Sequence, residues 1–190
     1  MSPLPPDLQQ LFDQIDAADR AGAAIAAGVT DEQFHWQPFA GRGWSIAQCL
    51  EHLAVMDAYY AAAVRGGVEE GRRRGLRRTG PGRSTFFGRR FIAAQEPPVR
   101  MKMKAPKVGR SPQDKPRQEI MRRYHEAHQY IRELILDAAD VDLTRATFPN
   151  PFIPIIRVRV ATALAILAAH DRRHLWQAEQ VKLAAGYPAG

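Results

Sequence analysis

The chain reads ATALAILAAHDRRHLWQAEQVKLAA from Ala161 to Ala185, a stretch of strong helix formers without glycine or proline. His170 and His174 lie four residues apart within it, so a helix places both side chains on one face. Small and apolar residues recur on this face at spacings of three and four, a pattern typical of a helix packed against a core. Two imidazoles placed in this way could bind one metal ion. The alternative is two surface or capping histidines.

The remainder of the chain predicts three further helices. We expect an all-α fold, a four-helix bundle, with helices over about residues 7–27, 45–65, 117–139 and 158–185. Ser45 and Gln48 form a capping box at the start of the second helix, and Gly66 and Gly67 are expected to end it. The segment 147–154 contains three prolines and is predicted to be a loop. Residues 1–190 are interpreted as a single domain.

The segment 66–116 is predicted to be a long, basic, irregular connection between the second and third helices. The chain has a net charge of +7, yet 16 Lys and Arg against 4 Asp and Glu lie between Arg65 and Arg117, and the remaining residues are mildly acidic. The Arg72 to Arg78 cluster could bind an anionic thiol cofactor or an anionic surface, or it could be solvated and disordered. We expect short helical pieces or partial disorder in the segment. An apolar patch in the segment is expected to dock on the bundle, formed by Phe86, Phe87, Phe91 and Ile92.

Composition and cysteine content exclude several classes of protein. The single cysteine, Cys49, precludes an internal disulfide and fits a reducing compartment. No apolar run reaches the roughly 20 residues of a membrane span, and the N-terminus carries no basic or apolar leader, so we expect a cytoplasmic protein that does not enter the membrane. The basic segment 65–117 could bind anions or nucleic acid. The acidic remainder and the lack of base-reading motifs argue against nucleic acid, which stays the weakest alternative.

His52 lies within the predicted helix 45–65, three residues after Cys49 and four before Met56, and so at or beside its apolar stripe. If this helix packs against the last one, His52 joins His170 and His174 in a three-histidine site with one coordination position open. Imidazoles that face a core without a partner cost desolvation free energy, which favours this interpretation. The alternative is three histidines that are satisfied separately.

Three further histidines are less suited to bind a metal. His35 lies in a loop beside Trp36 and is interpreted as a surface or packing residue. His125 and His128 have the i, i+3 spacing on the third helix, but the sequence offers no evident third ligand.

Other polar residues near the three histidines are weak candidates for catalysis. Glu51 and Asp171 are each adjacent in sequence to a histidine, but neighbouring helical residues point about 100° apart, and surface ion pairing is the alternative for both. Gln177, three residues after His174, could bond a ligand or simply cap the stripe. Cys49 could be a fourth ligand, a reactive thiol or a small apolar core residue.

Three stretches of the chain resemble the DinB-like superfamily of metal-binding four-helix bundles. WSIAQCLEHL, residues 44–53, is similar to that family's helix start with Trp, Ser or Thr and a later His-Leu pair. HDRRHLWQ, residues 170–177, is similar to its H-x-x-x-H-x-x-Q signature, and VRMKMKAPK, residues 99–107, to a basic stretch of many relatives. The order and spacing of the histidines fit as well, so the resemblance covers most of the chain.

The resemblance implies a divalent metal ion, zinc, nickel or iron, held by His52, His170 and His174, and it implies a homodimer. Some members of that family are thiol transferases that use bacillithiol or mycothiol, or thiol-dependent isomerases. We therefore predict a metal-dependent enzyme of the transferase or hydrolase type, with a small-molecule substrate and a low-molecular-weight thiol. The alternative is a non-catalytic metal-containing protein that binds a ligand or mediates stress-linked association.

Overall fold

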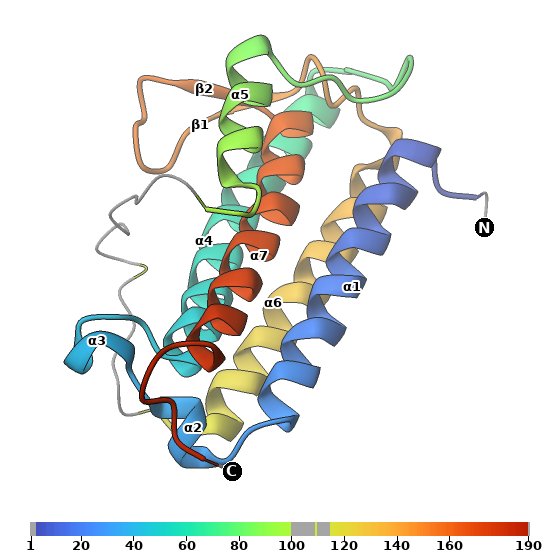
Figure 1. The fold of residues 1–190 in the computed structure, drawn as a ribbon. Helices are drawn as coiled ribbons and strands as arrows, with labels where there is room; N and C mark the ends of the chain where they lie inside the picture. The colour runs from blue at the N-terminus through green and yellow to red at the C-terminus, as the bar shows by residue number, and fades with distance from the viewer. Residues whose placement is uncertain (1–2, 100–108, 110–114, 190) are drawn as a thin grey trace.

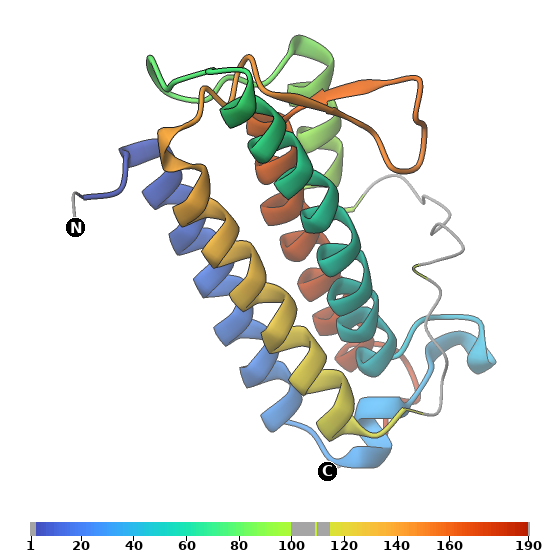
Figure 2. The same ribbon diagram turned by 180° about the vertical axis from the view of Figure 1, so that it is seen from behind.

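A computed structural model describes residues 3–99, 109 and 115–189 of the protein, and most of them are helical (Figure 1). The four long helices are α1 (Pro6–Ala27), α4 (Ile46–Arg73), α6 (Arg117–Asp137) and α7 (Val160–Lys182). α4 packs against α6 and α7, and α1 packs against the same two helices. Seen from behind, α6 lies beside α1 and α4 lies in front of α7 (Figure 2). The prediction of a mainly helical fold is confirmed.

Short elements connect the long helices. They are α2 (Asp31–His35), α3 (Pro38–Gly41), α5 (Phe86–Gln95), the 3-10 helix η2 (Ala138–Asp140), β1 (Thr147–Pro149) and β2 (Arg157–Arg159). The predicted capping box of α4 is present, because the Ser45 side chain accepts from the Gln48 N–H and the Gln48 side chain accepts from the Ser45 N–H. Within the described ranges, no helix is both long enough and apolar enough to cross a lipid bilayer.

α4 is longer than predicted. We expected the helix to end at Gly66 and Gly67, but it continues to Arg73. A Cβ atom at Gly71 would lie 2.9 Å from the Cβ of Ala146, so the missing side chain lets the segment after α6 approach the helix backbone. This close packing outweighs the low helix propensity of glycine, which is why the sequence signal was misleading.

The prediction that segment 147–154 is a loop is wrong for its first three residues, which form the strand β1. β1 pairs antiparallel with β2, and Phe148 lies opposite Val158. Pro149 stands at the end of β1, where a strand tolerates a residue without an N–H. Each strand has only three residues, too few for an alternating pattern to appear in the sequence.

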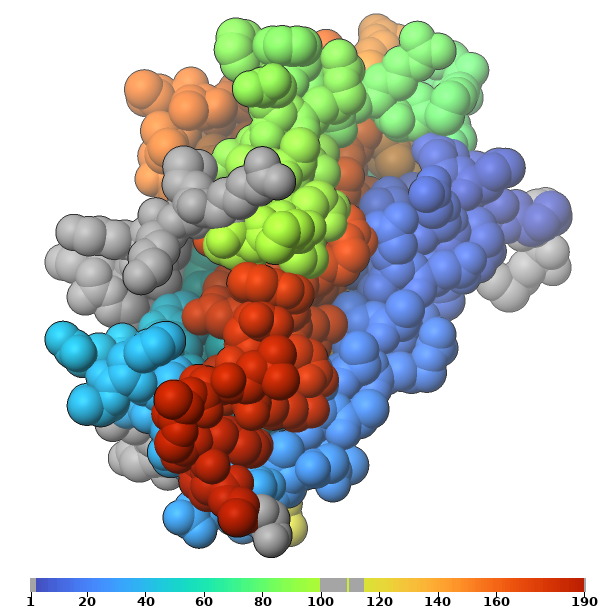
Figure 3. Space-filling view, in the orientation of Figure 1, coloured from blue at the N-terminus to red at the C-terminus, as the bar shows by residue number. Residues whose placement is uncertain are grey.

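The segment 66–116 is partly helical, as we had expected. It contains the end of α4 and the whole of α5, whereas most of the basic stretch 99–107 lies outside the described residues. Phe86 and Phe87 do not dock on the long helices, since they are 62% and 82% exposed. α5 packs against α7 instead (Figure 3). A Cβ atom at Gly88 would lie 2.6 Å from a Thr162 methyl carbon, so this glycine permits the close contact.

The core consists of two apolar clusters with a layer of polar residues between them. Along α4, one cluster ends at Ala54 and the other begins at Tyr60. The same change of cluster occurs between Tyr124 and Ile131 on α6, and between Ala168 and Leu175 on α7. Buried polar side chains lie near this level on all three helices: His52, Asp57, His128, Asp171 and His174.

Candidate metal centre

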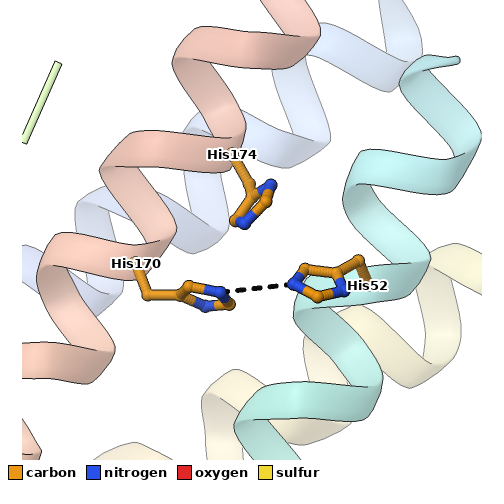
Figure 4. Close-up of side chains that lie close together, drawn as sticks. All are labelled: His52, His170 and His174. Atoms are coloured by element: carbon orange, nitrogen blue, oxygen red, sulfur yellow. Dashed lines mark hydrogen bonds between the residues drawn. The ribbon is translucent and has the colours of Figure 1, made fainter. Parts of the chain in front are cut away.

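Three histidines converge between α4 and α7 (Figure 4). His52 comes from the second turn of α4, and the spacing of four along α7 places His170 and His174 on the side that faces it. The Nε2 atoms of His52 and His170 are 3.3 Å apart, and one ring nitrogen from each histidine lies within 4.8 Å of the others. Two ligands of a tetrahedral ion with bonds of about 2.0–2.1 Å are about 3.4 Å apart. The spacing of the first pair therefore fits a single ion.

Contacts on the outer side of the rings determine which nitrogen keeps a lone pair. The Nδ1 atom of His52 lies 2.6 Å from the Gly109 carbonyl oxygen, and because a carbonyl only accepts, this Nδ1 carries the proton. The Nδ1 atom of His170 lies 3.7 Å from Asp57 Oδ1, a carboxylate that favours a proton on the same nitrogen. Both Nε2 atoms then present lone pairs to each other. A cation between them would remove that repulsion.

All three imidazoles are held in the neutral form that binds metal ions. Burial, together with repulsion from the charge that His52 can carry, lowers the pKa of His170 to about 3. Burial also lowers the pKa of His52, and it lowers that of His174 well below the usual value. At neutral pH the three rings therefore keep their lone pairs available.

Two neighbouring side chains shape the surroundings of the rings. Trp44 stacks on His174 with ring centroids 5.6 Å apart, and its centroid lies 4.9 Å from that of His52. Arg173 is only 6% exposed, and its positive charge contributes to the lowered pKa values of His170 and His174. Trp44 covers one side of the site, and Arg173 supplies a buried cation next to it.

The histidines border a cavity of about 1470 Å³. Much of its wall is apolar and aromatic, with Phe87, Phe91 and Phe152 among its residues. Among the described residues that line it are four arginines and a single carboxylate: Arg42, Arg157, Arg159, Arg173 and Asp57. A wall of this composition suits a small molecule that has an apolar or aromatic part and a negative charge.

The three weak candidates for catalysis occupy different places. Glu51 is 1% exposed, and it accepts from Lys115 at 2.6 Å and from Arg123, so it links α4 to the start of α6. Asp171 is fully buried and lies close to Asp57 and His128 instead of in the histidine group. Gln177 borders the cavity and is the one of the three placed to contact a ligand there.

The remaining candidates lie apart from the three histidines. Cys49 is fully buried in an apolar cluster, and burial raises the pKa of its thiol, so it behaves as a small apolar residue. His35 is held between two backbone carbonyl oxygens, each at 3.0 Å. His125 lies 2.5 Å from Asp19 on α1. None of these residues belongs to the groups of possible metal ligands found in the described part of the chain.

The Arg72 to Arg78 cluster is ordered, and its charges are largely compensated. Arg72 and Arg77 both contact Asp140, and Arg78 contacts Asp7 on α1. The expectation of disorder is therefore wrong for these three residues, although the side chain of Arg77 is solvated, at 76% exposure. Their ion pairs tie the end of α4 and the segment after it to η2 and to the start of α1, and they reduce the attraction that these arginines could exert on an anionic ligand.

Sequence reasoning missed a second buried group, formed by Asp57, His128 and Asp171, whose possible ligand atoms all lie within 4.8 Å of one another. A signal for it exists in the sequence. Asp57 continues the apolar stripe of α4 at spacings of three and four, and His128 and Asp171 do the same on α6 and α7. The stripes are Leu50, Leu53, Asp57, Tyr60 and Val64; Tyr124, His128, Ile131 and Ile135; and Leu164, Ala168, Asp171, Leu175 and Ala178.

Long helices that bring histidines together in their core define a class of helical proteins able to bind a metal ion between facing helices. The family model of the DinB superfamily matches residues 14–178 of this chain. The chain therefore belongs to the DinB superfamily, and the resemblance noted in the sequence is confirmed. No match was found among curated proteins or among solved structures.

Proposed function

We propose that this protein is a four-helix-bundle metalloenzyme of the DinB type, in which His52, His170 and His174 bind one divalent ion. The observation that supports this most is the 3.3 Å separation of two Nε2 atoms on neutral rings, both of which turn their Nδ1 atoms toward acceptors. Neutral imidazoles are good ligands for zinc, nickel and iron alike. The proposed reaction is thiol transfer or hydrolysis of a small molecule.

Bound by three neutral imidazoles, such an ion would supply the positive charge that lowers the pKa of a water molecule or thiol to about 7. The residues of the chain would position the reactants. The Gly109 carbonyl keeps His52 oriented, and Trp44 restricts the access of water to two of the rings. Arg173 would attract an anionic group of the substrate, and Gln177 is placed to form a hydrogen bond with it.

The composition of the cavity wall favours a partly apolar, anionic ligand, such as a carboxylated low-molecular-weight thiol or its conjugate. Arg42, Arg157 and Arg159 line the cavity, and none of them forms an ion pair within the described ranges. The proposed anion site is thus the cavity wall, whereas the sequence had suggested the Arg72 to Arg78 cluster. A homodimer and a cytoplasmic location are proposed on the family resemblance and on the single cysteine.

A turnover assay tests the proposed enzyme. Protein stripped by a chelator and protein reloaded with zinc, nickel or iron would be incubated with an electrophilic aryl halide and thiols of different charge, and separately with an ester. We expect product only with the loaded protein, and a loss of at least about a hundredfold in His174→Ala. His125→Ala is the matched control, because His125 lies on α6 and contacts Asp19 instead of the site.

Metal uptake without metal-dependent product in any of these reactions would contradict the enzyme and favour the alternative, a non-catalytic ligand-binding protein. The large cavity beside the histidines is the observation that supports a ligand-binding protein as the second candidate. Its direct test is binding of an apolar fluorescent anion, which a binder would take up with or without turnover.

A further inference from the structure

Asp57, His128 and Asp171 are each fully buried in the polar layer, and they come from three different helices, α4, α6 and α7. Burying a charged group costs much free energy unless the group is paired or coordinates a metal ion. The ion pairs that the two carboxylates make within the described ranges involve only histidines. Among the described residues no lysine or arginine forms an ion pair with either carboxylate, and only Arg172 interacts with Asp171 at longer range.

Five atoms of this group form no hydrogen bond among the described residues: both carboxylate oxygens of Asp57, both of Asp171, and Nε2 of His128. Most buried polar atoms in proteins are hydrogen-bonded, and each exception costs about 1–3 kcal/mol, or more where the atom is charged. Five such atoms at one point in the core therefore indicate a partner other than the protein itself.

The direction of the His128 lone pair indicates what that partner is. The Nδ1 atom of His128 lies 2.8 Å from the Tyr124 carbonyl oxygen and must donate to it, so Nε2 points away from Tyr124 and carries a lone pair whenever the ring is neutral. This Nε2 faces Asp171 Oδ2 at 3.5 Å. In the neutral ring, two electron-rich atoms face each other here as they do at the histidine site, and either a proton on Nε2 or a bound cation relieves that repulsion. The separation again matches two ligands of one ion with bonds of about 2.0–2.2 Å.

We propose that Asp57, His128 and Asp171 bind a second divalent cation, adjacent to the three-histidine site. Two carboxylates and one imidazole suit manganese, iron(II) or zinc, and a doubly charged ion would balance the two buried negative charges. Asp57 is among the residues that line the cavity next to His170, so the cavity is the side from which an ion would enter. This site does not depend on the proposed enzyme activity.

The test is the number of metal ions bound per chain. Chelator-stripped, full-length protein would be dialysed to equilibrium against zinc or manganese and analysed by mass spectrometry of the metal. We expect two ions per chain for the wild type, one for Asp171→Asn, and one for the double variant His52→Ala/His174→Ala. Glu179→Gln is the matched control, since it removes a half-exposed carboxylate of the same helix and should leave two ions bound.

One ion per chain in both the wild type and Asp171→Asn would overturn the second site and would mean that a proton on His128 or between the carboxylates balances the charge. If only the histidine site fails to bind metal, the result is different. The wild type then binds one ion per chain, and the double variant His52→Ala/His174→Ala binds one as well. If Asp171→Asn does not fold, crystals of the wild type soaked in manganese decide the question. We expect an anomalous-scattering peak between Asp57, His128 and Asp171, and its absence beside a peak at the three histidines would overturn the proposal.

Discussion

Two buried imidazoles in the polar layer, those of His52 and His128, share one arrangement. In each, Nδ1 contacts a backbone carbonyl oxygen and Nε2 faces another acceptor atom. His52 donates through Nδ1 to Gly109, and His128 donates through Nδ1 to Tyr124. A carbonyl fixes the tautomer without adding charge, so the free nitrogen keeps its lone pair. This arrangement of single residues is what makes the layer suited to cations.

Glu51 illustrates how a candidate for catalysis becomes a structural residue once its contacts are known. We expect Glu51→Gln to lower the free energy of unfolding by about 1–3 kcal/mol, because Lys115 and Arg123 lose the charge that they share at a buried position. Chemical denaturation measures this, and metal affinity measured on the same samples should stay unchanged. A hundredfold loss of affinity with unchanged stability would assign Glu51 to the site.

The convergence of His52, His170 and His174 could be predicted from the sequence, but the grouping of the buried carboxylates near them was not. Two histidines four residues apart on the buried face of a helix indicate a shared ligand. His52 was identified because it lies at the apolar stripe of its helix and matches the family pattern. Asp57 and Asp171 were not recognised as a group, because an aspartate in a helix is usually solvated and the sequence does not show which residues of α4, α6 and α7 stand at the same level. Only packing brings them together.

At the scale of elements, α4 shows how packing can overrule a local signal. Gly66 has no atom within 4 Å of its would-be Cβ, whereas a Cβ at Gly71 would lie 2.9 Å from the side chains of Val141 and Ala146. We therefore expect Gly66→Ala to raise the free energy of unfolding by about 0.5–1 kcal/mol through helix propensity. Gly71→Ala should lower it by about 1–3 kcal/mol through overpacking.

Thermal or urea unfolding of the two variants, which carry the same substitution in one helix, provides the comparison. Equal shifts of the same sign would contradict the close approach at Gly71. The same contrast explains why the end of α4 was predicted too early. The sequence shows the glycines, but it does not show that the segment around Val141 and Ala146 packs on one of them.

At the scale of the whole molecule, the polar layer couples stability to pH in the metal-free protein. The folded pKa of His170 is about 3 and those of His52 and His174 are also lowered, against about 6.5 in an unfolded chain. Below pH 6.5 these histidines bind protons in the unfolded chain but stay neutral in the folded chain. The contribution of these rings to the free energy of unfolding of the metal-free protein therefore keeps its full value above pH 6.5. It decreases as the pH falls toward 3, by several kcal/mol in all.

Urea unfolding of chelator-treated protein between pH 7.5 and 4.5 measures this effect. The raised pKa values of Asp57 and His128 act in the opposite direction, so the decisive quantity is the difference from His170→Ala/His174→Ala. We expect the free energy of unfolding to fall more steeply with decreasing pH in the wild type than in this variant. Parallel profiles would mean that the rings are solvated in the folded protein.

The four long helices could be predicted because each carries a continuous stripe, and α1, α6 and α7 begin and end within a few residues of the expected positions. The paired strands β1 and β2 could not, since three residues carry no recognisable period. The division of the core into two apolar clusters also escaped prediction. This division depends on how the helices are shifted relative to one another along their axes, and a single sequence does not show that shift.

The central claim is that three imidazoles bind a common ion, and X-ray absorption at the zinc edge tests it most directly. Chelator-stripped protein would receive half an equivalent of zinc per chain, so that the site richest in nitrogen fills first. We expect three imidazole nitrogens at about 2.0–2.1 Å from the zinc. A zinc coordination sphere with fewer than three imidazoles would show that His52, His170 and His174 do not share an ion.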